Sequence, residues 1–362
     1  MRQKEQERSE IKLPANGDRI AERDFAGTAH VSYSEQPPTT YLLARGDYRQ
    51  PRQAIPPAGL QAIEHAAGLP SDLALNSFAS DAERRRALAD WTSDPRNPLT
   101  ARVFVNRVWY YHFGQGIVDT PSDFGFSGGA PSHPELLDWL AADFIASGWD
   151  VKALHRRIVM SRTYRQQSRV VNPKAEQIDS DNRLLWRANR QRLEGEEVRD
   201  AVLSVAGALN SQLGGPSFRD VNVALKQNHE FTTPTNEFND DTCRRAIYRL
   251  WARSGNHPLL TGFDCPDPTV AAPRRARTIT PLQALSLFNN RFMETVSKRF
   301  ASRVEQQAGD DVASQVSAAW TLALQRPPSE NELANAIRFL KQHGLAELCL
   351  TLVNTNEFLY VD

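Results

Sequence analysis

The sequence predicts a mainly α-helical protein, an irregular multi-helix bundle with a minor two-stranded β element and long loops. Two observations support this prediction. After residue 80, apolar side chains recur at the i, i+3, i+4, i+7 spacing that places them on one face of a helix. Several of these stretches begin at a serine or threonine that is followed three positions later by glutamate or glutamine, a pattern that starts helices.

Composition and charge narrow the functional classes. The chain has 362 residues, of which 40% are hydrophobic and 24% charged, as in ordinary globular proteins. Its formal net charge is zero, which argues against a general nucleic-acid or membrane-surface binder. No apolar run approaches the length of a membrane span. Most basic residues are arginine, which suits bidentate pairing with carboxylates, although codon bias explains the excess more simply.

Residues 1–80 differ from the rest of the chain. They contain few periodic apolar runs and several prolines, so we expect an extended N-terminal arm or linker. Within it, residues 40–43 are predicted to form one short strand, and the Arg-Gly-Asp triplet at 45–47 is interpreted as a turn. Residues 81–362 are expected to form the helical domain, either as one body or as two lobes, 81–215 and 243–362.

The first predicted helices follow in close order. A charged helix covers residues 81–91, and a second begins at Pro98 and ends before Gly114. A capping box of Ser132 and Glu135 is expected to start the third helix. Asp150 is expected to cap the fourth, whose apolar stripe includes His155, interpreted as a core histidine.

The middle of the chain is less regular. A helix is predicted from residue 194 to residue 210, stopped by the glycines at 214 and 215. Residues 216–242 lack periodicity and are interpreted as a long loop or insertion. Residues 245–252 are rich in strand-forming types, so we predict a strand there that could pair with residues 40–43.

The C-terminal part reads as a series of helices. The longest is predicted from a capping box at Thr280 to residue 304, with one apolar stripe that includes Leu282, Leu285, Met293 and Val296. Further helices are predicted around residues 312–323, after a capping box at 329–332, and after Gly344.

Nine short motifs resemble one family. They are NPLTARV (97–103), VNRVW (105–109), HFG (112–114), TPSDFG (120–125), SHPELLDWL (132–140), SRTYRQ (161–166), NRLLWR (182–187), RLE (192–194) and NEFLYVD (356–362). Together they are similar to the planctomycete-specific domain of unknown function that accompanies planctomycete cytochrome c-like domains. The resemblance covers roughly residues 37–362.

The resemblance implies a setting but no reaction. Longer members of the family resemble exported, multidomain proteins with a haem-binding module upstream. This chain has no CxxCH motif and no apolar signal segment at its start, so it is interpreted as the C-terminal module, and haem binding is not transferred to it. The resemblance suggests an exported or cell-surface protein, whereas the residues themselves leave the localisation unknown.

One group of residues is the candidate catalytic site. Asp123 lies in a loop between two predicted helices, His133 lies at the start of the next helix, and Arg107 and His112 lie on the helix before the loop. A histidine, a carboxylate and an arginine near one loop can serve acid–base catalysis or hold an anion. In the alternative, structural interpretation, Asp123 caps a turn, His133 bonds Ser132 and Arg107 braces the loop.

Other constellations are weaker. Asp123 and Glu194 could be the two carboxyls of a glycosidase, but the sequence cannot show that they meet. The carboxylates at 194, 196, 197 and 200 are explained by the favourable helix dipole at a first turn. Three cysteines without CxxC spacing do not suggest a disulfide framework. No metal-binding or phosphate-loop motif is present, so we expect no metal and no cofactor.

These observations leave two principal hypotheses for function. The first is an interaction or structural module of a larger, exported multidomain system related to cytochrome c-like proteins, with other domains of that system as partners. The alternative is a hydrolase acting on complex carbohydrate through Asp123, His133 and Arg107. A third possibility is an inactive fragment. Neither principal hypothesis involves nucleic acid or a membrane span.

Overall fold

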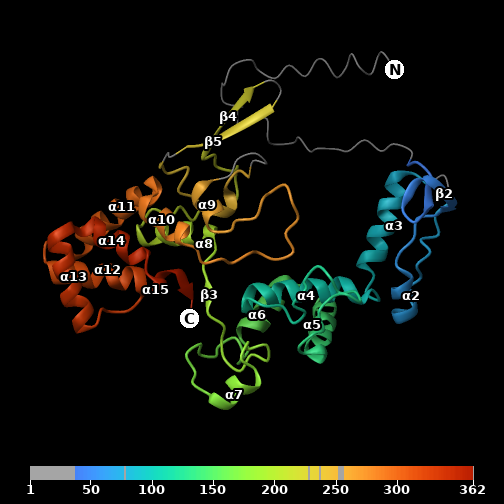
Figure 1. Ribbon diagram of the computed structural model, residues 1–362, viewed down its shortest axis with the longest axis horizontal. Helices are drawn as coiled ribbons and strands as arrows, with labels where there is room; N and C mark the ends of the chain where they lie inside the picture. Colours follow the sequence, from blue (N-terminus) through green and yellow to red (C-terminus); the bar gives the residue numbers. More distant parts are fainter. Residues whose placement is uncertain (1–36, 77–78, 227–228, 236–237, 252–256, 362) are drawn as a thin grey trace. The chain divides into compact units, whose positions relative to one another are not determined.

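The computed structural model describes residues 37–76, 79–226, 229–235, 238–251 and 257–361. The chain divides into two compact units, Met1–Pro98 and Leu99–Asp362. The predicted mainly α-helical fold is confirmed, and the named strands of the described residues form three two-stranded antiparallel sheets (Figure 1). In the described residues, no helix is both long and apolar enough to cross a membrane. Residues 1–36 of the predicted arm lie outside the described residues.

The first unit contains a hairpin and two helices. Strands β1 (Thr40–Ala44) and β2 (Asp47–Ile55) pair antiparallel, and helices α2 (Gln61–Ala67) and α3 (Asp81–Ser93) follow. Arg45 and Gly46, both with positive φ, form the two-residue turn that the right-handed strand twist favours. The predicted strand at 40–43 and the turn at 45–47 are therefore confirmed, but the partner of the strand is β2.

The second unit begins with three predicted helices, which are confirmed as α4 (Pro98–Phe113), α5 (Pro134–Ala146) and α6 (Val151–Val159). Asp150 caps α6 as predicted, because its side chain accepts a hydrogen bond from the Ala153 N–H. Buried apolar residues from all three helices form one core, including Ala101, Val105, Leu137, Leu140, Leu154 and Ile158.

The predicted capping box at Ser132 is wrong. The N-cap of α5 is His133, without a side-chain capping bond, and the Ser132 hydroxyl instead bonds the Ile117 carbonyl and the His133 ring. The Ser132 backbone N–H also donates to the Ile117 carbonyl, at 2.9 Å, and this bond holds Ser132 beside Ile117. The buried Asn106 amide, which bonds both the N–H and the carbonyl of Val118, holds this segment in place.

A short strand leads from this core into the rest of the unit. After α7 (Pro173–Ile178), strand β3 (Gln191–Arg192) pairs with β6 (Tyr360–Val361), the last strand of the chain. Helix α8 (Gly195–Val205) follows at once. It ends earlier than the predicted residue 210, because Gly207 turns the chain with a left-handed φ of 67°.

Two predictions for the middle of the chain are corrected. Residues 216–242, predicted to be a long loop or insertion, contain a hairpin of β4 (Val221–Lys226) with β5 (His229–Pro234). The predicted strand at 245–252, whose last residue lies outside the described residues, contains instead the 3-10 helix η2 (Ala246–Tyr248).

Side chains explain the absence of a strand between residues 245 and 251. Asp200 accepts a hydrogen bond from the Ala246 N–H, and Arg249 Nε donates to the buried Asp220 carboxylate at 2.8 Å. These side-chain bonds fix the segment together with one isolated backbone bridge, in which the Phe218 N–H donates to the Tyr248 carbonyl and the Leu250 N–H donates to the Phe218 carbonyl. Helix α9 (Pro258–Gly262) follows.

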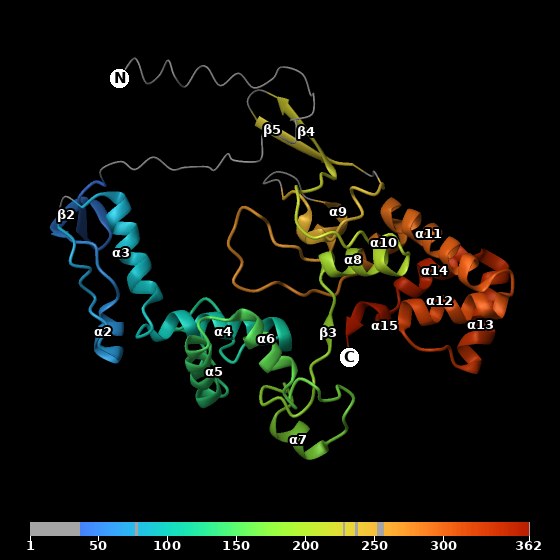
Figure 2. The ribbon, with the colours of Figure 1, turned by 180° about the vertical axis from the view of Figure 1, so that it is seen from behind.

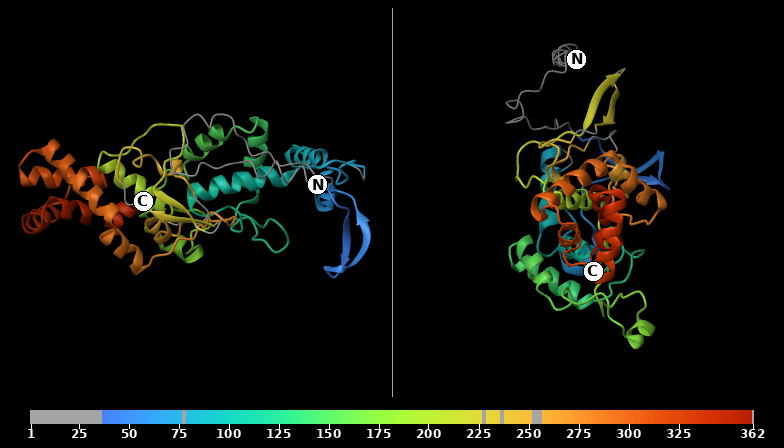
Figure 3. Two further views of the ribbon diagram at one scale, coloured as in Figure 1. Left: turned by 90° about the horizontal axis from the view of Figure 1, so that it is seen from above. Right: turned by 90° about the vertical axis from the view of Figure 1, so that its left-hand side faces the viewer.

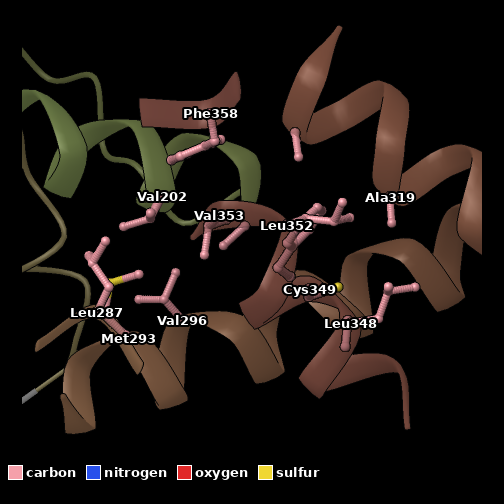
Figure 4. Close-up of a cluster of buried hydrophobic side chains, with 14 of the residues drawn as sticks. Val202, Leu287, Met293, Val296, Ala319, Leu348, Cys349, Leu352, Val353 and Phe358 are labelled. Atoms are coloured by element: carbon pink, nitrogen blue, oxygen red, sulfur yellow. The ribbon is translucent and has the colours of Figure 1, made fainter. Parts of the chain in front are cut away.

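The C-terminal helices form the larger core. They are α10 (Pro281–Asn289), α11 (Arg291–Ala308), α12 (Val312–Leu324), α13 (Glu330–His343), α14 (Leu345–Val353) and α15 (Asn356–Leu359). Helices α11 to α14 stay together in every view (Figures 1, 2 and 3). Their apolar stripes meet one another and α8, with Val202, Val296 and Leu352 among the buried side chains (Figure 4). Cys243 and Cys349 are buried in this core, and all three cysteines are free.

The predicted long helix from Thr280 to residue 304 is broken in two. Its capping box of Thr280 and Gln283 is confirmed, but Asn290 has extended backbone angles and accepts the Phe292 N–H with its side chain. Asn290 therefore ends α10 and caps α11. The break lets Leu287 enter the core, whereas Leu282 and Leu285, predicted on the buried stripe, are exposed.

The packing of α14 gives a stability prediction. Leu352→Ala should lower the free energy of unfolding by about 2–5 kcal/mol, because a cavity replaces a fully buried side chain in the larger core. Urea denaturation followed by circular dichroism measures the change. The matched control, Leu213→Ala at an exposed leucine, should change it by less than about 0.5 kcal/mol. Equal losses in the two variants would contradict the assigned core.

Candidate functional site

Asp123, one of the three predicted catalytic residues, makes its hydrogen bonds within a turn. Its side-chain Oδ1 accepts the Gly125 N–H at 2.8 Å, and its carbonyl accepts the Thr120 hydroxyl at 2.7 Å. The chain returns closely past it, since a Cβ added at Gly128 would overlap the Asp123 carbonyl oxygen. These contacts match the structural interpretation, in which Asp123 shapes the loop.

The other two predicted catalytic residues, His133 and Arg107, also lie apart from a common site. His133 Nδ1 is 2.9 Å from the Ser132 hydroxyl oxygen, and Arg107 is exposed on α4. In the described part of the chain, no hydrogen bond or ion pair joins any two of Arg107, Asp123 and His133. Neither of the two large cavities described next is lined by any of them. The structure thus does not bring the three together, and their catalytic role stays a prediction.

Two large cavities adjoin the first turn of α8, and Glu194 and Glu197 line both. The acidic cavity has a volume of about 480 Å³, and its lining includes Glu196, Asp200, Trp251, Cys265 and Arg275. The polar cleft has a volume of about 490 Å³, and its lining includes Tyr111, His112, Tyr164, Gln191, Arg192 and Arg277. Both volumes fall in the range of small-molecule sites.

An arginine–carboxylate pair forms part of the wall of the acidic cavity. Arg275 binds Glu196 through two hydrogen bonds of 2.7 and 2.8 Å, and the Cys265 thiol donates to the same carboxylate at 3.5 Å. Burial is the largest single effect and raises the pKa of Glu196, but the hydrogen bonds and charge of Arg275, together with hydrogen bonds from the Glu196 backbone and Cys265, lower the pKa below the ordinary 4.5. Burial, with Glu196 beside it, raises the pKa of Cys265 to about 12.

Glu194, between the two cavities, has the opposite shift. Burial raises its pKa, and Arg275 at 3.0 Å and Arg277 at 3.6 Å only partly offset this effect. The neighbouring carboxylates of Glu197 and Glu196 raise it further. Carboxyl groups with a raised pKa beside a cavity are often functional.

Hydrogen bonds join the end of α4 to the segment before β3 and so build the polar cleft. Gln191 Nε2 donates to the His112 carbonyl at 2.7 Å, and Asn189 Nδ2 donates to the Phe113 carbonyl at 3.2 Å. Gly114 permits this approach, because its left-handed φ of 76° turns the chain beside Gln191 and Arg277.

A histidine pair lies at the same end of α4. His112 Nε2 is 2.7 Å from His155 Nδ1, and the Tyr164 ring meets the His112 ring edge-on at 5.5 Å. Burial and the neighbouring His155 lower the pKa of His112 below its ordinary 6.5, so the ring is neutral at physiological pH. The interpretation of His155 as a core histidine is wrong, because His155 is exposed. Within the described residues, no group of three or more His, Cys, Asp or Glu side chains could hold a metal ion.

A third feature is an apolar surface on α10. We use the name α10 face for Ile279, Leu282, Leu285 and Phe288, which are 77%, 73%, 55% and 47% exposed. Leu282, Leu285 and Phe288 lie within about 120° of one another around the helix, on the side opposite to Leu287, and Ile279 immediately precedes the helix N-cap. From Thr269 to Met293 the sequence contains four arginines and no Asp or Glu, and two of these arginines, Arg275 and Arg277, pair with carboxylates of the first turn of α8.

Sequence reasoning missed the cavities beside α8. The carboxylates at 194–200 were explained by the helix dipole alone, and the arginines at 275 and 277 were not connected with them. The sequence held one signal: a run of carboxylates at a helix start and a separate run of arginines, in a chain with balanced charge. Their pairing depends on contacts across about eighty residues, which local patterns do not contain.

Comparison with known proteins assigns most of the chain to one family. Residues 84–340, more than half of the chain, match the family model PSD1, described as a protein of unknown function (DUF1553). The match includes the first turn of α8 and the α10 face. A search of curated proteins and a search of solved structures gave no match. The predicted association with planctomycetes and with cytochrome c-like domains stays a prediction.

The opposite pKa shifts of Glu194 and Glu196 predict opposite effects of pH. The ionised Glu194 destabilises the fold above its raised pKa but not below 4.5, so Glu194→Gln should stabilise the protein near neutral pH and lose this benefit in acid. The Glu196 carboxylate stabilises the fold above 4.5, and this stabilisation is lost as the pH falls through its lowered pKa. Glu196→Gln should therefore destabilise the protein near neutral pH, and less so in acid.

Urea denaturation of both variants and the parent protein, at about pH 7 and about pH 3, measures these effects. The two variants act as matched controls for each other, because each replaces one carboxylate of the same helical turn by an amide. Changes of the same sign at neutral pH would contradict the assigned pattern of ion pairs.

Proposed function

We propose that this chain, which belongs to the family described as protein of unknown function (DUF1553), is an interaction module that binds a partner protein through the α10 face. We further propose that this partner is another domain of an exported, multidomain system related to cytochrome c-like proteins, as the sequence resemblance implies. The observation that carries the proposal is the exposure of four large apolar side chains, three on the outer side of α10 and one, Ile279, just before the helix.

Exposed apolar side chains on a surface matter when they are contiguous. Isolated ones are normal, but a patch bordered by polar groups is typical of an interaction site. Leu282, Leu285 and Phe288 occupy neighbouring turns of one nine-residue helix, which Leu287 anchors to the larger core. A rigid helix that presents such a row is suited to pack against another amphipathic helix.

Charge indicates the kind of partner. Arg274 precedes the α10 face, Arg291 follows it, and no carboxylate occurs in the sequence between Thr269 and Met293. A guanidinium group pairs well with carboxylates because its planar fork matches their geometry. We therefore infer a partner segment that is apolar on one side and flanked by Asp or Glu. The alternative hydrolase built on Asp123, His133 and Arg107 has no comparable support, since each of these residues lies in a local setting.

A synthetic amphipathic peptide tests the proposal. The peptide carries leucines at i, i+3, i+4 and i+7 and glutamates on its flanks, and a matched peptide carries lysines in place of the glutamates. The acidic peptide should bind the full chain, and Leu282→Glu combined with Leu285→Glu should weaken binding by about tenfold or more. Fluorescence anisotropy measures the affinities, and cross-linking with mass spectrometry locates the bound peptide.

Two results would overturn this proposal. One is equal binding of the acidic and basic peptides, or cross-links away from α10. The other is binding to vesicles of anionic lipid that the double substitution abolishes, with no binding of either peptide, which would make the α10 face a membrane contact. Ile178→Glu, at an exposed isoleucine on α7, is the matched control and should leave peptide binding unchanged.

A further inference from the structure

The polar cleft has the features of a binding site that are independent of the α10 face. Its walls come from the end of α4, the segment after α6, strand β3 and its flanks, and the first turn of α8. Hydrogen bonds between Gln191 and the His112 carbonyl, and between Asn189 and the Phe113 carbonyl, join these parts. The cleft is thus largely formed before any ligand enters, which lowers the entropic cost of binding.

Two exposed tyrosines are among the residues that line the cleft. Tyr111 and Tyr164 line it and are 60% and 41% exposed, although large aromatic side chains are usually more buried. Edge-on contacts with the rings of His112 and Phe113, at 5.5 and 5.8 Å, fix the ring of Tyr164. The electron-rich face of an aromatic ring attracts weakly positive C–H groups, so an oriented tyrosine suits the C–H face of a sugar ring.

The charged groups of the cleft balance one another. Its charged lining residues are Arg192 and Arg277 on one hand and Glu194 and Glu197 on the other, while His112 is neutral at physiological pH. Such a cleft has little net field to select a strongly anionic or cationic ligand. It offers both donors and acceptors, together with the amide of Gln191, which favours a neutral ligand rich in hydroxyl groups.

We propose that the polar cleft binds a neutral saccharide, with Tyr164 and Tyr111 stacking on a sugar ring and the groups of Gln191, Glu197 and Arg277 binding its hydroxyls. The site is separate from the α10 face, so the test of saccharide binding is independent of the proposed docking of a partner protein. It also differs from the predicted site at Asp123, His133 and Arg107, none of which lines this cleft.

Isothermal titration of the full chain with defined oligosaccharides tests the proposal. The neutral probes are cellohexaose and maltohexaose, and the charged probes are oligogalacturonate and chitosan oligomers. At least one neutral probe should bind with saturation and more tightly than both charged probes. Tyr164→Ala should weaken that binding by about fivefold or more, because a stacking surface is lost.

Controls separate a lost contact from a lost fold. Tyr111→Ala removes the more exposed ring and should also weaken binding, so the test remains decisive if Tyr164→Ala does not fold. Tyr48→Ala, at an exposed tyrosine of β2 in the other unit, is the matched control and should leave binding unchanged. Saturation by no neutral probe, or binding unaffected by both cleft substitutions, would overturn the proposal. Preferential binding of a charged probe would overturn the assignment of a neutral ligand.

Discussion

The second unit depends on one short pairing, between residues 191–193 and residues 359–361. Strands β3 and β6 have two residues each, and the Leu193 N–H extends the pairing to the Leu359 carbonyl at 2.8 Å. So short a ladder has little stability of its own. It persists because Phe358 and Leu359 are buried in the larger core beside it. The end of the chain therefore fixes the point where α8 begins, and with it the carboxylates that line both cavities.

The same segment also connects the two cores of this unit. Asn189 and Gln191 bond the end of α4, which belongs to the smaller core, and α8 belongs to the larger one. Polar side chains thus join the two cores, and apolar packing occurs within each core. Clefts tend to form at such polar junctions, because side chains that bond backbone carbonyls do not fill space as a close-packed core does.

The sequence predicts those parts of the fold that are specified locally. Capping at Asp150, Thr280 and Ser329, and the glycines at 114 and 344, mark helix ends that the structure confirms, because each signal acts within a few residues. Distant contacts overrode the other predictions. The Ser132 hydroxyl bonds the Ile117 carbonyl instead of capping α5. Residues 245–251 take their conformation from contacts to Asp200 and Asp220.

Asn290 shows the limit of periodicity most clearly. If α10 and α11 were one helix, Leu282 and Leu285 would share a buried face with Met293 and Val296. Asn290, with its extended backbone angles, breaks that relation, and the spacing of the apolar residues does not reveal the break. The candidate site has the same limitation. Residue types at 194–200 and 275–277 suggest charge pairing, but the convergence of Glu194, Glu197 and Arg277 beside His112 and Tyr164 depends on the tertiary fold.

The buried thiols have a practical consequence. Burial raises the pKa of Cys243, Cys265 and Cys349, so each stays a protonated thiol at neutral pH, and only a thiolate reacts quickly with alkylating reagents. For the buried Cys243 and Cys349, modification then requires that the surrounding structure open first. These two cysteines are natural reporters: Cys349 for opening of the α11–α14 bundle, and Cys243 for opening of the segment beside α8.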